Sequence, residues 1–303
     1  MTGSQIYDII RPGFRDLIHS NIGLTQIASG LVWTEGPVWF PAHDMLLFSD
    51  IPRAHIYSWT PHGGVSLYQQ NSDYANGNTR DREGRLLTCQ HGTRSLVRTE
   101  HDGSRTTIAH SHNGKRLNSP NDVVVRSDGS IWFSDPTYGI LSNLEGYKAD
   151  QEQDGRFVYR VEPDTHTITA VSRDFVQPNG LAFSADETRL IVAESGSSHD
   201  PSVPSVLRGY DVSPDGRLTN MHDLAEIDQG LPDGLRVDAY DNIWCSAADG
   251  VHVFSPTGEL LGKILVPATV SNLTFGGPRR NMLFITATSC VYSIFVNVSG
   301  AVD

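Results

Sequence analysis

The chain has 303 residues, 38% of them hydrophobic and 19% charged, which is typical of a globular protein and excludes an intrinsically disordered one. Its formal net charge of −12, with no cluster of basic residues, argues against a nucleic-acid partner and favours a bound cation. The longest apolar runs are strand-sized and far short of the roughly 20 residues that a membrane helix needs, so we expect no membrane partner.

Residues 1–25 are expected to form a short, partly helical N-terminal extension ahead of a β-rich domain that occupies residues 26–303. The first 20 residues carry charges throughout and contain no apolar core of a secretory signal, which predicts a cytoplasmic protein. Helical periodicity is nearly absent after residue 30, so strands and turns are expected from there on.

Six segments of the domain share one pattern: a polar residue, a short strand, a tight turn, and a strongly apolar strand. They begin at Glu35, Asn76, Asn121, Asn179, Asp233 and Asn272. The starting positions are 41, 45, 58, 54 and 39 residues apart, and the two longest intervals contain inserts after Tyr138 and Glu194. A four-stranded propeller blade occupies about 40–45 residues. The repeats therefore predict an all-β, six-bladed propeller with four-stranded blades, which explains six copies of one hairpin better than a β-sandwich does.

The six repeat starts all carry a side-chain oxygen, and none is histidine or cysteine. In a propeller, residues at equivalent starts of the innermost strands meet at one end of the central axis. Glu35 and Asp233 would neutralise a divalent cation there, while Asn121 and Asn179 would add neutral oxygen ligands. Calcium is favoured, and magnesium, manganese or zinc can also occupy such a site. The alternative is that each of these residues only caps a turn.

The segments WTEGPVWF, NSPNDVVVRSDGSIWFSDPTYG, QPNGLAFSAD and LPDGLRVDAYDNIW closely resemble the bacterial gluconolactonases of the SMP-30/gluconolactonase/LRE family, over about residues 26–295. The resemblance implies a six-bladed propeller that hydrolyses sugar lactones and related esters with one divalent metal ion. It also implies that Glu35, Asn179 and Asp233 bind the metal and that Asn121 faces the metal or the substrate. Animal members have an arginine where this chain has Ser119, so their sugar-acid specificity is not implied.

The chemistry of such a site assigns roles to the two acids. A metal-bound lactone carbonyl is polarised, and a carboxylate within reach of both metal and water can act as general base. Asp233 is the candidate base, and Glu35 is expected to be chiefly a structural ligand.

Four further residues are assigned to substrate binding: Asn76, His91, Asp135 and Tyr138. His91 follows the apolar strand of the second repeat and could reach the axis as an acid or base, or serve as a structural hydrogen-bonding group. Asp135 and Tyr138 begin the first long insert, where binding loops often lie, and Asp135 could equally cap the turn before Pro136.

Three functions remain open from the sequence. The first is a calcium-dependent lactonase acting on a small lactone, as a monomer or weak homodimer. The second is a promiscuous paraoxonase-like esterase or phosphotriesterase that uses His91. The third is a non-catalytic propeller whose metal only ties the blades together.

Overall fold

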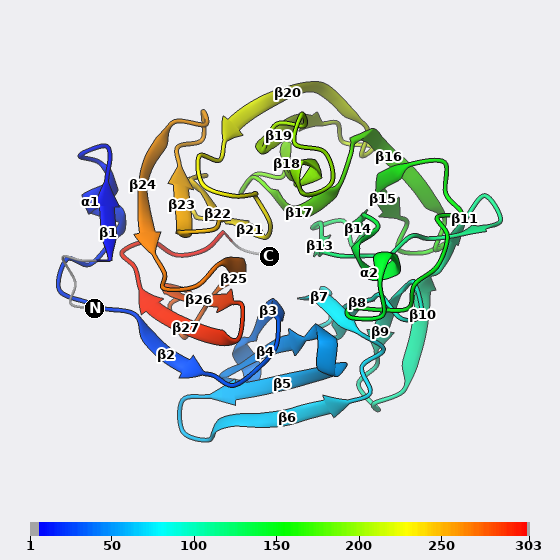
Figure 1. The fold of residues 1–303 in the computed structure, drawn as a ribbon, viewed down its shortest axis with the longest axis horizontal. Coiled ribbons are helices and arrows are strands. Elements are labelled where there is room, and N and C mark those ends of the chain that lie inside the picture. The colour runs from blue at the N-terminus through cyan, green and yellow to red at the C-terminus, as the bar shows by residue number, and fades with distance from the viewer. Residues whose placement is uncertain (1–5, 302–303) are drawn as a thin grey trace.

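The computed structural model describes residues 6–301, which form six β-sheets arranged as blades around a central axis (Figure 1). The predicted all-β, six-bladed propeller with four-stranded blades is confirmed. The first two blades contain β3 (Thr34–Phe40), β4 (Met45–Asp50), β5 (His55–Thr60) and β6 (Gly64–Gln70), then β7 (Ala75–Arg80), β8 (Leu86–Gln90), β9 (Ser95–Thr99) and β10 (Arg105–Ala109). The next two contain β13 (Val123–Val125), β14 (Ile131–Asp135), β15 (Arg156–Val161) and β16 (Ile168–Phe175), then β17 (Pro178–Phe183), β18 (Arg189–Glu194), β19 (Val206–Val212) and β20 (Leu218–Glu226).

The N-terminal strands complete the last two blades. The fifth blade contains β21 (Leu235–Val237), β22 (Ile243–Ser246), β23 (Gly250–Phe254) and β24 (Leu260–Leu265), and β1 (Tyr7–Ile9) adds an edge strand to it. The sixth contains β25 (Val270–Gly276), β26 (Met282–Ala287) and β27 (Cys290–Phe295), with β2 (Thr25–Ala28) as its outermost strand. Because β2 comes from the start of the chain and β27 from its end, their antiparallel pairing closes the ring.

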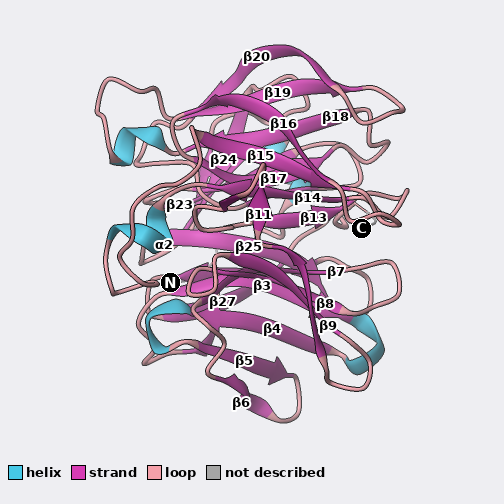
Figure 2. Ribbon diagram, turned by 90° about the vertical axis from the view of Figure 1, so that its right-hand side faces the viewer, coloured by secondary structure: helices cyan, strands magenta, loops and turns pink. Residues whose placement is uncertain are grey.

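Helical segments are few and short, and strands make up the body of the molecule (Figure 2). They are α1 (Phe14–Leu17), α2 (Tyr138–Leu141) and the 3-10 turns Pro41–His43, Ile51–Arg53 and Gly196–Ser198. A two-stranded ribbon, β11 (Ser111–His112) with β12 (Lys115–Arg116), precedes the third blade. Within residues 6–301 no helix is long and apolar enough to cross a membrane.

Apolar packing between blades stabilises the ring. Six hydrophobic clusters occur among residues 6–301, and each contains side chains from two consecutive blades. The second strand of a blade is covered on both faces, which explains its almost continuous apolar sequence. Every residue of β14, for example, is buried. The innermost strands also contact one another in sequence from β3 to β25, and β25 contacts β3. The axis is therefore enclosed by six neighbouring strand starts.

The seam between the sixth and first blades gives a stability prediction. Phe284 on β26 is fully buried and stacks on Trp39 of β3, with ring centroids 5.2 Å apart. Phe284→Ala should lower the free energy of unfolding by about 3–5 kcal/mol, because the cavity it leaves lies between two blades. Phe295→Ala, at a position that is 41% exposed on β27, is the matched control and should change it by less than about 1 kcal/mol. Urea denaturation of both variants checks this, and equal losses would contradict it.

Candidate functional site

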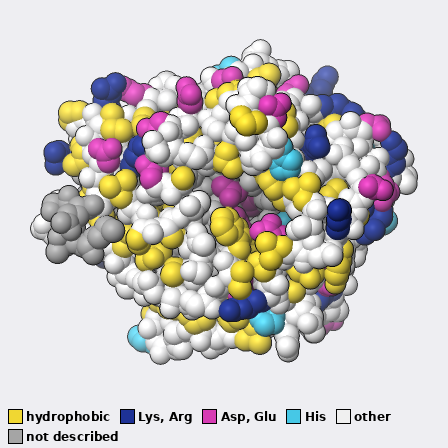
Figure 3. All heavy atoms as spheres, viewed as in Figure 1, with side chains coloured by type: hydrophobic (Ala, Val, Ile, Leu, Met, Phe, Trp, Pro, Cys, Tyr) yellow, Lys and Arg dark blue, Asp and Glu magenta, His cyan; other side chains and the backbone are white. Residues whose placement is uncertain are grey.

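The six repeat starts lie around one end of the axis. Glu35, Asn76, Asn179 and Asn272 belong to innermost strands, while Asn121 and Asp233 come two residues before β13 and β21. Contacts between successive blades link them. The Gly77 N–H donates to the carbonyl oxygen of Asn121 at 2.8 Å, and the Gly180 N–H donates to that of Asp233 at 3.0 Å. The Asn272 amide donates to the Glu35 carboxylate at 3.1 Å. The space-filling view shows acidic side chains in the central hollow (Figure 3).

A glycine follows four of these residues because neighbouring strands approach too closely for a side chain. A Cβ at Gly77 would lie 2.3 Å from the Asn121 carbonyl oxygen, and one at Gly180 would lie 2.3 Å from that of Asp233. A Cβ at Gly36 would lie 2.1 Å from Asn76, and one at Gly234 would lie 2.1 Å from Asn272. Gly36 also has a φ of +50°. Real Cβ atoms do not make such contacts, so these glycines determine how narrow the ring of donors is.

Three carboxylates meet at this end of the axis: Glu35, Asp122 and Asp233. The pKa of Glu35 is raised to about 8, chiefly by burial and also by the nearby Asp122 charge, against opposing hydrogen bonds from Gly36 and Asn272. Burial raises the pKa of Asp233 well above its usual range, and the charges of Glu35 and Asp122 add to this effect. A hydrogen bond from the Asn179 side chain opposes the rise. The site therefore favours either protonation or a bound cation.

Asp122 belongs to this group although the sequence analysis did not assign it a role. It is 1% exposed, accepts a hydrogen bond from the Asn272 amide at 3.3 Å, and lies 3.7 Å from Nη1 of Arg236. In a regular β-strand successive side chains point to opposite faces, so the residue after Asn121 would point away from the axis. The two residues precede β13, however, so the alternation does not apply to them.

His91 is buried beside Asn76 and has a defined tautomer. Its Nδ1 lies 2.8 Å from the carbonyl oxygen of Glu145, which can only accept a hydrogen bond, so Nδ1 carries the proton. Nε2 then accepts from the Asn76 amide nitrogen at 3.2 Å. This contact orients Asn76 so that its Oδ1, which is buried, has no hydrogen-bond partner. Burial lowers the pKa of His91 to about 4, so the ring is neutral at pH 7.

The first insert supplies Glu145, a second residue without a role in the sequence analysis. Its carboxyl is partly buried, burial raises its pKa, and its charge adds to the raised pKa values of Glu35 and Asp233. The insert packs tightly on His91, since a Cβ at Gly139 would lie 2.4 Å from the imidazole ring. No local pattern identifies Glu145, because its place depends on how the whole insert folds back.

The other two predicted substrate-binding residues lie at different depths. The Tyr138 hydroxyl hydrogen-bonds to the Ser195 carbonyl at 3.3 Å and the Ser198 hydroxyl at 3.0 Å. Burial raises the pKa of Tyr138, and the charge of Asp233 adds to the rise. Asp135 is fully buried and accepts from the Asn118 N–H at 2.8 Å, and burial raises its pKa to about 7. This hydrogen bond stabilises the loop that carries Asn121.

Ser119, where the resemblance expects an arginine in animal members, is fully buried and structural. Its hydroxyl donates to the Pro136 carbonyl at 2.7 Å and accepts from the Gly139 N–H at 3.0 Å. It therefore fixes the start of the insert.

A second group of metal-ligating residue types, Asp228, Asp249 and His252, lies on the outer part of the fifth blade. The Lys263 ammonium lies among them, 2.6 Å from Asp228 and 3.2 Å from Asp249. This lysine pairs with both carboxylates, so a metal ion would have to displace it.

Comparison with known proteins matches the chain to one family. The family model described as the SMP-30/gluconolactonase/LRE-like region matches residues 33–289 of the chain. The chain belongs to this family. A gluconolactonase from Zymomonas mobilis is 32% identical over 99% of this chain and 89% of its own length. The solved structure of a gluconolactonase from Xanthomonas campestris has a TM-score of 0.89 and 34% identity, covering 96% of this chain and 94% of that one. A candidate gluconolactonase structure has a TM-score of 0.92 and 41% identity, covering 98% and 100%.

The raised carboxyl pKa values predict how stability depends on pH. A carboxyl with a raised pKa binds more protons in the folded protein than in the unfolded one, so its contribution to stability is lost as pH rises. For Glu35 this loss falls between about 4.5 and about 8. We expect protein freed of divalent cations to be less stable at pH 8 than at pH 5, as measured by denaturant unfolding. Glu35→Gln should reduce this slope, and an unchanged slope in that variant would contradict the assignment.

Proposed function

We propose that the protein is a metal-dependent lactonase that opens a sugar lactone of the gluconolactone type. The gluconolactonases among its relatives support the reaction class. The observation that carries the proposal is the convergence of six side-chain oxygen donors from six successive blades, two of them acidic, at one end of the axis. A propeller that served only as a scaffold would not need this arrangement.

The donor set fits a hard divalent cation. The Oδ1 of Asn76 is buried without a partner, and three carboxylates lie close together. Among the ion pairs of residues 6–301, one involves these carboxylates, and it joins Arg236 to Asp122. Glu35, Asn121, Asn179 and Asp233 would hold the cation. We favour calcium because all four donate oxygen, and magnesium or manganese would suit the same chemistry better than zinc, which commonly takes nitrogen or sulfur ligands.

The two acids take different roles. A bound cation supplies Lewis-acid polarisation of the lactone carbonyl. Glu35 is 3% exposed and held by the Gly36 N–H at 2.8 Å and by Asn272, so it serves as a fixed ligand. Asp233 is more exposed than Glu35, so it is the better placed of the two to contact a water molecule. Asp233 therefore acts as the general base that accepts the proton of the attacking water.

The remaining side chains position the substrate. The free Oδ1 of Asn76 can accept a hydrogen bond from a sugar hydroxyl, and His91 holds the amide in that orientation. Tyr138 is the candidate for contacting the leaving hydroxyl, because the charge of Asp233 acts on its own hydroxyl. Both ring nitrogens of His91 already have partners, and its lowered pKa makes it a weak base. These contacts favour the lactonase over the paraoxonase-like alternative, which needs His91 as a base.

Metal removal tests this function. Protein treated with chelator and then dialysed should lose hydrolysis of gluconolactone, measured as acid release, and regain it when calcium is added. Elemental analysis verifies the metal content at each step, and magnesium, manganese and zinc are tested in parallel. Full activity in protein shown to be metal-free would overturn the proposal.

Asp233→Asn separates metal binding from base catalysis. The asparagine keeps an oxygen donor of nearly the same shape but cannot accept a proton, so kcat should stay about 10²- to 10⁴-fold lower at saturating calcium. Calcium affinity should also weaken, because ligand charge is one determinant of it.

The control is Asn179→Ala, which removes a neutral ligand and should be largely rescued by added calcium. Near-normal kcat of Asp233→Asn at high calcium would show that Asp233 is only a ligand.

A further inference from the structure

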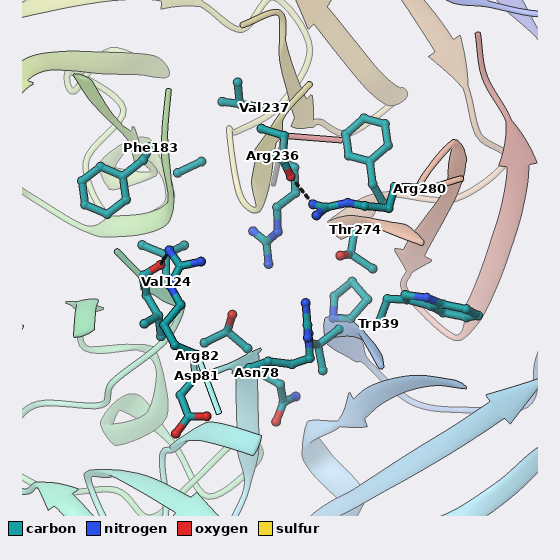
Figure 4. A pocket seen from close by; sticks show the side chains of 18 of the residues that line it. Trp39, Asn78, Asp81, Arg82, Val124, Phe183, Arg236, Val237, Thr274 and Arg280 are labelled. Atoms are coloured by element: carbon teal, nitrogen blue, oxygen red, sulfur yellow. Dashed lines mark hydrogen bonds between the residues drawn. The ribbon is translucent and has the colours of Figure 1, made fainter. Parts of the chain in front are cut away.

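A cavity of about 310 Å³ lies among the six innermost strands (Figure 4), and its lining residues place it at the end of the axis opposite to the six repeat starts. Each innermost strand lines it with residues two to four positions after its donor, for example Asn78 after Asn76 and Arg236 after Asp233. At about 3.3 Å per strand residue, these side chains lie roughly 7–13 Å further along the axis. The cavity is therefore a separate place from the proposed metal centre.

The cavity is positively charged in a protein with a formal net charge of −12. Its lining contains four arginines, Arg80, Arg82, Arg236 and Arg280, and two carboxylates, Asp81 and Glu187. Arg82 of the lining pairs with Glu187 at 3.2 Å, and basic residues outside the lining pair with both carboxylates. Arg85 lies 2.7 Å from Asp81, and Arg126 lies 3.7 Å from Glu187. A concave site with this excess of one charge concentrates anions.

Two of the arginines are held in place by the surrounding backbone. Arg82 donates to the carbonyl oxygens of Val125 at 3.0 Å and Arg126 at 3.1 Å. Arg236 donates through Nη1 to the Leu235 carbonyl at 2.7 Å, and its guanidinium extends towards the middle of the cavity (Figure 4). A guanidinium has five N–H donors in one plane, so a fixed one is prepared to bind a carboxylate or phosphate.

The polar side chains of Asn78, Thr79, Ser184 and Thr274 also line the cavity, beside an apolar wall that includes Trp39, Val124, Phe183 and Val237 around the guanidinium groups (Figure 4). Such a wall excludes water from a carbon frame and offers little to a bare inorganic anion. The volume lies at the lower end of the roughly 300–1,000 Å³ typical of small-molecule sites. The combination suits a ligand with one anionic group and a short carbon chain.

We propose that this cavity is a second ligand site, which binds a short-chain organic carboxylate with its carboxyl group on Arg236 and its carbon chain against the apolar wall. Arg236 also lies 3.7 Å from Asp122, the carboxylate beside the proposed metal centre. The anion and Asp122 would thus share one guanidinium. Binding at this cavity requires neither the lactonase reaction nor a bound cation.

Calorimetric titration of pentanoate into the full chain, dialysed free of divalent cations, tests the site without a contribution from the metal centre. We expect saturable binding at one site that weakens as ionic strength rises. Arg236→Gln and Arg82→Gln should each weaken it by at least about 10-fold, because each removes a charge-assisted contact or a nearby charge. Arg98→Gln is the control: it removes a charge from β9, outside the lining, and should leave the affinity unchanged.

Arg82→Gln leaves the contact between Arg236 and Asp122 intact, so it keeps the test decisive even if Arg236→Gln does not fold. Thermal denaturation establishes folding of each variant. Absence of pentanoate binding, or equal affinity in the wild type and Arg82→Gln, would overturn the proposal. Inorganic phosphate that binds as tightly as pentanoate would overturn the assigned ligand class, because it has no carbon chain to occupy the apolar wall.

Discussion

The free edges of the innermost strands impose the constraint on which the structure depends. Such a strand has a sheet partner on one side only, and its other edge faces the axis, where buried N–H and carbonyl groups still need partners. The ring meets this need with hydrogen bonds between blades, such as that from the Gly77 N–H to Asn121 and that from the Gly234 N–H to Ser271. These close approaches leave no room for a Cβ at four of the six positions, where glycine follows Glu35, Asn76, Asn179 and Asp233.

The same contacts force polar side chains together. Burial and the charge of Asp122 raise the pKa of Glu35 and of Asp233, an arrangement that destabilises the charged form of the metal-free site. The apolar clusters that offset this lie between the blades, away from the axis. Packing between the blades thus stabilises the fold and holds these acidic and amide side chains in positions that they would not adopt by themselves.

The two ends of the axis differ in the charge of the side chains around them. Carboxylates and amides gather where the innermost strands begin, and arginines gather where they end. The contact between Arg236 and Asp122 marks the boundary between the two halves. Beside it, the Asn78 amide donates to the carbonyls of Gly36 and Asn76, with its oxygen accepting from Thr88, so the boundary is closed by satisfied polar groups. A charge bound in one half therefore acts on the other through a short, low-dielectric path.

The sequence alone determined the number of blades and which six residues stand at equivalent places in them. Both depend on a local hairpin pattern that recurs in one register, and equal register in a closed ring brings equivalent residues to the same end. Only the tertiary structure decided which side chains join them from elsewhere. Asp122 reaches the site because strand β13 begins one residue later, and Glu145 reaches it because a long insert folds back over His91. The arginine-lined cavity likewise draws on turns from several blades, whose approach no single segment encodes. Each repeat can be recognised in the sequence by its own hairpin pattern. These contacts, in contrast, form between packed segments that have no sequence pattern in common.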